Sequence, residues 1–93
     1  MTETATTVPT VSAYFNPVLN ALRTLGGNAS NAEMDAQVAL ELALTADQLA
    51  LPHKAEAPDR SEHAYRCAWA RTYLKKTGHL SNPRRAFWSL TPQ

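Results

Sequence analysis

Hydrophobic residues recur at helical spacing in two long segments of the chain. The first begins at Thr10 or Ser12, either of which can cap a helix, and reaches about Leu25. Its apolar positions are Val11, Tyr14, Phe15, Val18, Leu19, Leu22 and Leu25. This stripe continues across Pro17, which predicts a buried helix kinked at the proline. The alternative is a regular helix that starts only at Asn16–Pro17.

The second segment, from about Ser61 to Thr77, predicts the long helix around which the chain is organised. Asp59 and Glu62 have the spacing of a capping box, and Gly78 suits a left-handed cap after the last turn. The apolar stripe of this helix comprises Cys67, Ala70, Tyr73, Leu74 and Thr77. Its opposite face, which we expect to be exposed and cationic, carries Arg71, Thr72, Lys75 and Lys76.

Shorter elements are predicted between these two helices. Asn28–Ala29 follows a Gly-Gly stop and can add a very short strand. Ser30 with Glu33 forms a capping box for a helix to about Leu42, and Thr45 with Gln48 forms another for a turn of helix to about Ala50. Leu51–Pro58 contains two prolines and is predicted to be a surface loop.

After Gly78 the spacing changes from helical to alternating, which predicts a hairpin of Leu80–Ser81 against Phe87–Leu90. The intervening Asn82–Arg85 has turn chemistry and carries Arg84 and Arg85 at its tip. A cationic helix followed by a cationic hairpin is typical of a winged helix-turn-helix. We therefore predict a mainly α (α+β) fold with a small antiparallel β-hairpin wing over residues 8–93, after a disordered leader at residues 1–7.

The 93 residues are enough for one domain, and their net charge of +1 conceals an asymmetry. Residues 1–59 hold two basic and seven acidic side chains, a net −5, whereas residues 60–93 hold seven basic and one acidic, a net +6. Such asymmetry favours a polyanionic partner, of which duplex DNA is the obvious example. The alternative is an ordinary solvated face.

The chain holds three histidines and one cysteine, which raises the question of a zinc site. His63 and Cys67 are four residues apart, but His53 and His79 supply no second close pair, so we expect no metal and no cofactor. The simpler interpretation is two exposed histidines and a half-buried thiol. Cys67 lies on the apolar stripe and is expected to act as a small apolar group, and we expect no catalytic site.

The cysteine count and the hydropathy of the chain also indicate the cellular compartment. One cysteine excludes an internal disulfide and fits a reducing compartment. Neither a signal peptide nor an apolar run of membrane-spanning length is evident, so we expect a cytoplasmic protein with no membrane partner.

The role of the aromatic residues and that of the two wing arginines each have two interpretations. Tyr65, Trp69 and Tyr73 recur every four residues, and packing against the first two helices is favoured over stacking on nucleic-acid bases. Trp88 is likewise expected to anchor the wing on the core. Arg84 and Arg85 are expected to reach phosphates or a minor groove, the alternative being charges that protect a sheet edge.

Several motifs resemble those of the N-terminal winged-helix domain of Mrr-type restriction endonucleases, over nearly the whole chain after Thr7. The matching stretches are Val8–Thr10, Phe15–Leu19 with Leu22, Leu44–Gln48, Arg66, Ala68–Ala70, Tyr73–Lys75, Gly78, Leu80 and Arg85–Pro92. The Phe-x-Pro-Val-Leu start and the Arg-x-x-Trp-x-Leu-Thr end are the more specific ones. The family commonly has glycine where this chain has Ala86.

The resemblance implies a non-catalytic recognition domain for duplex DNA, with methylated or modified DNA as the target class, that positions a separate C-terminal nuclease domain. The DNA-binding residues would be Arg71, Thr72, Lys75, Lys76, Arg84 and Arg85. The alternative is a protein-interaction winged helix that mediates homodimerisation or docks on a nuclease domain through the acidic half of the chain.

Overall fold

The computed structural model describes residues 7–54 and 57–91, and the predicted disordered leader lies outside them except for Thr7. The helices are the 3-10 turn η1 (Val11–Tyr14), α1 (Phe15–Thr24), α2 (Asn31–Glu41), α3 (Ala46–Ala50) and α4 (Glu62–Lys76). The strands are β1 (Asn28–Ser30), β2 (Pro52–Lys54), β3 (Ala57–Ser61), β4 (Leu80–Arg84) and β5 (Phe87–Leu90).

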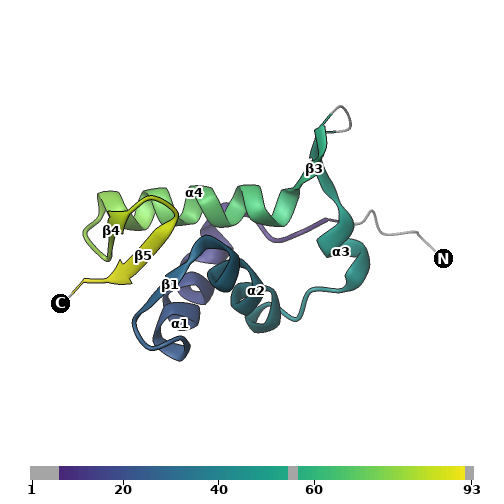
Figure 1. Ribbon diagram of the computed structural model, residues 1–93. Helices are drawn as coiled ribbons and strands as arrows, with labels where there is room; N and C mark the ends of the chain where they lie inside the picture. The colour runs from purple at the N-terminus through teal and green to yellow at the C-terminus, as the bar shows by residue number, and fades with distance from the viewer. Residues whose placement is uncertain (1–6, 55–56, 92–93) are drawn as a thin grey trace.

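Helix α4 forms one long side of an elongated molecule of 47 × 27 × 20 Å, with α1 and α2 packed against its other side (Figure 1). The β4–β5 hairpin lies at the C-terminal end of α4, and the β2–β3 hairpin projects beyond its N-terminal end. Strand β1 pairs antiparallel with β5, and β5 with β4, so the predicted short strand does join the wing sheet. The predicted α+β winged-helix fold is therefore confirmed.

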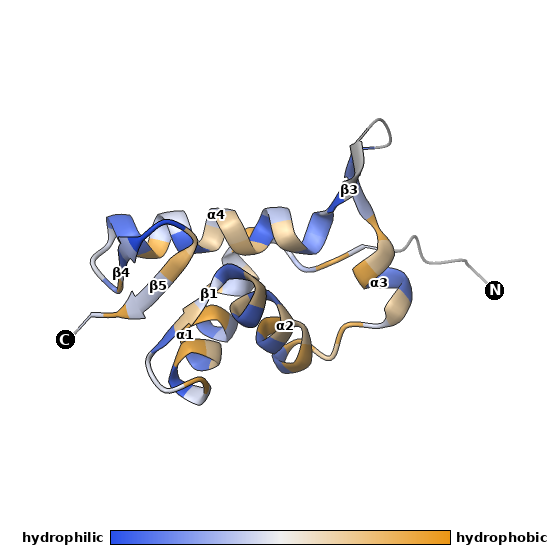
Figure 2. Ribbon diagram, viewed as in Figure 1, coloured by the Kyte–Doolittle hydropathy of each residue, from blue (hydrophilic) through white to orange (hydrophobic). Residues whose placement is uncertain are grey.

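The core lies where three helices meet, and it uses most of the predicted apolar stripes. On α4 the prediction is wrong for Tyr73, which is 46 % exposed, and for Thr77, which is also exposed. Its fully buried side chains include Tyr14, Val18 and Leu22 from the first helical segment, Met34 and Val38 from α2, and Cys67 and Ala70 from α4. Figure 2 shows hydrophilic residues at the turn between β4 and β5, away from this core.

Two helix starts differ from the expectation. The first segment is not one kinked helix: it begins as the turn η1, and α1 starts at Phe15, which leaves Pro17 in its first turn, where its missing N–H costs no bond. Helix α4 is capped by Ser61, whose hydroxyl accepts from the Ala64 N–H at 3.0 Å, and Asp59 belongs to β3. The capping boxes of α2 and α3 are confirmed.

Both hairpins differ from the predicted secondary structure. Leu51–Pro58 is not simply a loop, because β2 pairs with β3 across it. The wing strands extend further than expected, so Arg85 and Ala86 alone form the turn. Ala86 has a φ of 61°, in the left-handed region that glycine adopts without strain. Asn82 stabilises the wing by donating its side-chain amide to the carbonyls of Arg84 and Phe87, at 2.7 and 2.6 Å.

Candidate nucleic-acid interface

The outward face of α4 lies opposite its buried stripe. It carries Tyr65, Trp69, Thr72 and Lys76, which follow the i, i+4, i+7, i+11 spacing of one helical face. Trp69 is 41 % exposed, and Thr72 and Lys76 are exposed as well. This face is therefore both aromatic and cationic, where the sequence had predicted a cationic surface only.

Five exposed cations lie on α4, just before it, and on the wing. We call them the cationic face: Arg60, Lys75, Lys76, Arg84 and Arg85. None of the five forms an ion pair with another residue of the described part of the chain. The Arg84 guanidinium lies over the Phe87 ring, 4.3 Å from its centroid, which holds the arginine at the wing. The predicted positions of Lys75, Lys76, Arg84 and Arg85 thus leave their charges available to a ligand.

Arg71 does not lie on that face, and its predicted exposure is wrong. Its side chain is 4 % exposed, and Nη1 donates to Oδ1 of Asp35 at 2.6 Å. The guanidinium also lies 5.8 Å from the centroid of the Trp88 ring. Position 71 follows the buried Cys67 by one helical turn, so its side chain points toward α2. Arg71 therefore connects α4 to α2 and to β5.

Trp88 is placed as predicted, packed on the core, where Nε1 donates to Oδ1 of Asn31 at 2.7 Å. The other aromatic prediction is wrong, because the α4 aromatics lie along the outer side of the helix. They form a run of ring contacts in which His53 and Tyr65 stack at 3.6 Å, Tyr65 and Trp69 are 6.3 Å apart, and Trp69 and Tyr73 are 5.9 Å apart. Among the ring contacts of the described residues, one links these aromatics to α1: Tyr73 makes an edge contact with the Phe15 ring.

The predicted exposure of the histidines is wrong for His63, which is 4 % exposed. Its Nε2 lies 2.8 Å from the backbone oxygen of Asp35, and because a carbonyl only accepts, Nε2 donates. Nδ1 then accepts from the Tyr14 hydroxyl, also at 2.8 Å. Burial raises the pKa of the Tyr14 hydroxyl and that of the Cys67 thiol. Cys67 is fully buried rather than half-buried, which makes it unreactive.

The Arg66 side chain makes hydrogen bonds within the fold and is not part of the cationic face. Its Nη1 donates to the backbone oxygens of Val8 and Pro9, at 3.0 and 2.6 Å, and its Nε donates to Glu62 at 2.6 Å. Burial alone would raise the pKa of Glu62, but hydrogen bonds from His53 and Arg66 and their positive charge lower it below its ordinary value of 4.5. These contacts fasten the segment before η1 to the start of α4.

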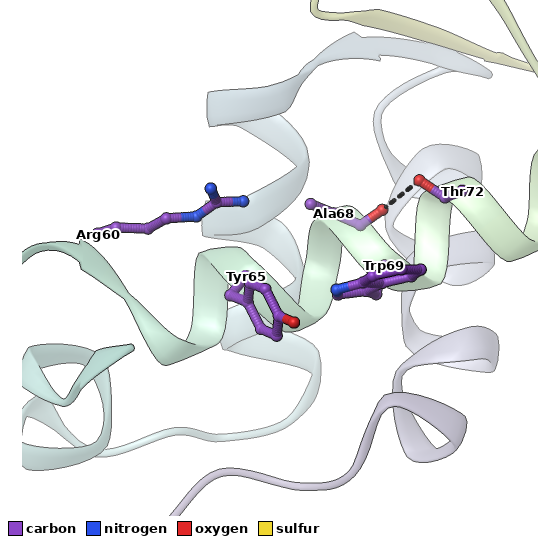
Figure 3. A pocket seen from close by; sticks show the side chains of 5 residues that line it. All are labelled: Arg60, Tyr65, Ala68, Trp69 and Thr72. Carbon is purple, nitrogen blue, oxygen red and sulfur yellow. Dashed lines mark hydrogen bonds between the residues drawn. The ribbon is translucent and has the colours of Figure 1, made fainter. Parts of the chain in front are cut away.

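A cavity of about 350 Å³ opens on the outer face of α4 (Figure 3). Its lining consists of Arg60, Tyr65, Ala68, Trp69 and Thr72. Within residues 7–54 and 57–91, no three His, Cys, Asp or Glu side chains come together as metal ligands would. The sequence did not predict this cavity, although Tyr65 and Trp69 fall outside the predicted apolar stripe of α4 and could have indicated it.

The order α1, β1, α2, α4, β4, β5 and the antiparallel sheet β1–β5–β4 define a winged-helix domain, in which α4 directly precedes the wing hairpin. The family model of the Mrr N-terminal domain matches residues 12–93. The chain belongs to this family, which associates it with Mrr-type restriction proteins. Neither the curated proteins nor the solved structures gave a match. No described helix is both long and apolar enough to cross a membrane.

Proposed function

We propose that this domain binds duplex DNA through the cationic face, with α4 in the major groove and the β4–β5 wing beside it. The observation that carries the proposal is the cationic face itself: five exposed cations on α4, on the residue before it and on the wing, none of which forms an ion pair within residues 7–54 and 57–91. Phosphate contacts by lysine and arginine supply most of the affinity of such interfaces.

Individual roles follow from position. Lys75 and Lys76 lie in the last turn of α4, where they would meet phosphates at the groove edge. Arg84 and Arg85 lie at the wing turn and would contact the flanking backbone or minor groove. Thr72 remains exposed, and its hydroxyl donates to the Ala68 carbonyl while its oxygen can still accept.

Membership in the Mrr N-terminal domain family supports a linked nuclease domain as the partner that this domain positions on DNA. Catalysis would then belong to that partner and recognition to this chain, in the cytoplasm where both would meet DNA. Whether the target DNA is methylated is a separate expectation that rests on the family resemblance.

A second candidate is a protein-docking or homodimerising winged helix. The observation that favours it is the exposure of Leu40 in α2 and Leu49 in α3, at 73 % and 41 %, beside the acidic Glu41 and Asp47. Large exposed leucines with acidic neighbours would suit a basic partner surface. This candidate predicts a concentration-dependent molecular mass and no duplex binding at low salt.

Fluorescence anisotropy with a short labelled duplex, at about 50 and 200 mM salt, tests the proposal. Wild type should bind with a log–log salt slope near −0.9 per phosphate contact. Arg84→Ala with Arg85→Ala should weaken binding to any sequence about equally and make the slope shallower by about 1 per lost contact.

Arg23→Ala is the matched control, because Arg23 is exposed on α1 and is not part of the cationic face, and among the described residues its side chain donates to Asn20 on the same helix. It should bind like wild type. Identical binding by wild type and the wing double variant at both salt concentrations would exclude the wing as a DNA contact.

A further inference from the structure

The cavity on α4 combines an aromatic platform with a cation. Trp69 is 41 % exposed and forms one wall, and the Arg60 guanidinium lies 5.4 Å from the Tyr65 ring centroid (Figure 3). His53 already stacks on Tyr65 at 3.6 Å with an interplanar angle of 17°, so one face of that ring is occupied. The indole of Trp69 is therefore the aromatic surface that remains open to a ligand.

The size and polarity of the cavity narrow the class of ligand. Its volume of about 350 Å³ is at the lower end of the roughly 300–1,000 Å³ of small-molecule sites, which suits one planar ring system. Arg60 offers N–H donors and forms no ion pair with a described side chain, while the Thr72 oxygen can accept. A nucleobase has both acceptors and donors along its edge, and its flat faces stack on indole.

We infer that this cavity holds a single unstacked nucleobase, with Trp69 as the stacking platform and Arg60 and Thr72 facing the base edge. The inference rests on the proposed DNA binding, since the other residues of the cationic face would hold phosphates of the same DNA. A base within an intact duplex cannot offer its face to a side chain. The domain should therefore prefer DNA in which one base is already unpaired.

Two short duplexes of the same sequence test this, one fully paired and one with a single bulged 2-aminopurine at its centre. Wild type should bind the bulged duplex about 5- to 150-fold more tightly, the ratio that base–aromatic stacking supplies. The emission of 2-aminopurine should fall on binding, because stacking on indole quenches it. Trp69→Ala should abolish both the preference and the quenching, and Trp69→Phe should retain a reduced preference.

Leu40→Ala is the control. Leu40 is an apolar residue of α2 that is 73 % exposed and does not line the cavity, so its removal should leave the affinity ratio unchanged. Circular dichroism melts establish that each variant is folded. If wild type binds the paired duplex but shows no preference for the bulged one, this inference is wrong and the proposed function stands. The same holds if Trp69→Ala leaves the ratio of the two affinities unchanged. No binding to either duplex overturns the proposed function itself.

Discussion

The pairing of Arg71 with Asp35 gives a sharp test of the structure, because the sequence predicted Arg71 to be a DNA contact. The arginine is 4 % exposed and the Asp35 side chain 24 % exposed. Asp35→Ala leaves a buried guanidinium without its carboxylate, and its Nε already has no hydrogen-bond partner in the described chain. Arg71→Met keeps most of the buried stem and leaves a carboxylate that water can reach.

These two variants should therefore differ in the free energy of unfolding. Removing one partner of a buried ion pair costs about 3–5 kcal/mol, and the partial exposure of Asp35 reduces this to about 2–4 kcal/mol for Asp35→Ala. Arg71→Met removes the charged hydrogen bond without stranding a buried charge and should cost about 1–2 kcal/mol. The double variant should resemble Arg71→Met, since it strands no charge, so the two effects should be strongly non-additive.

Urea denaturation of the four proteins measures these differences, and the salt dependence of duplex binding supplies an independent readout. If Arg71 is buried as described, Arg71→Met should keep the wild-type salt slope. A slope shallower by about 1 would mean that Arg71 reaches a phosphate. An Asp35→Ala variant more stable than Arg71→Met would refute the reasoning about the stranded charge.

Further variants test the core and the start of α4. Leu74→Ala should cost about 2–5 kcal/mol in urea denaturation, since Leu74 is 6 % exposed; a loss under about 0.5 kcal/mol would contradict its burial. Tyr14→Phe should cost about 1–3 kcal/mol because it leaves Nδ1 of His63 without its donor, and a neutral result would place water there instead. Cys67 should react with a thiol reagent only as the protein unfolds, so labelling in native buffer as fast as in urea would exclude its burial. Glu62→Gln should be less stable than wild type above pH 4.5, because the lowered pKa makes ionised Glu62 stabilising, and the difference should shrink as the pH falls below that value; a constant difference would contradict the pKa shift.

Local signals in the sequence predicted the helices and the wing well. The capping boxes at Ser30 and Thr45 start helices as expected, because a cap depends only on residues three positions apart. The β2–β3 hairpin was missed because Pro52 and Pro58 suggested a loop. A two-stranded ribbon consists of edges alone, and a proline there need not interrupt a ladder hydrogen bond.

The wrong predictions for Arg71 and His63 have a common cause. A hydrophobicity pattern assigns each side chain to the core or to the surface from the polarity of that side chain alone. Arg71 and His63 lie within the buried arc because Asp35 supplies a carboxylate to one and a backbone oxygen to the other, from a different helix. A buried polar group requires such partners, and local spacing does not reveal them.

The aromatic residues of α4 were misassigned for the converse reason. Helices α1 and α2 both pack on one side of α4 (Figure 1), and the buried residues of α4, among them the small Cys67 and Ala70, lie on that side. Trp69 then falls outside the buried arc, beside Lys76 on the exposed face. Tyr73 follows the same helical period and was assigned to the buried stripe, but it is 46 % exposed, so the packing of α1 and α2 decides which part of the apolar pattern on α4 is buried.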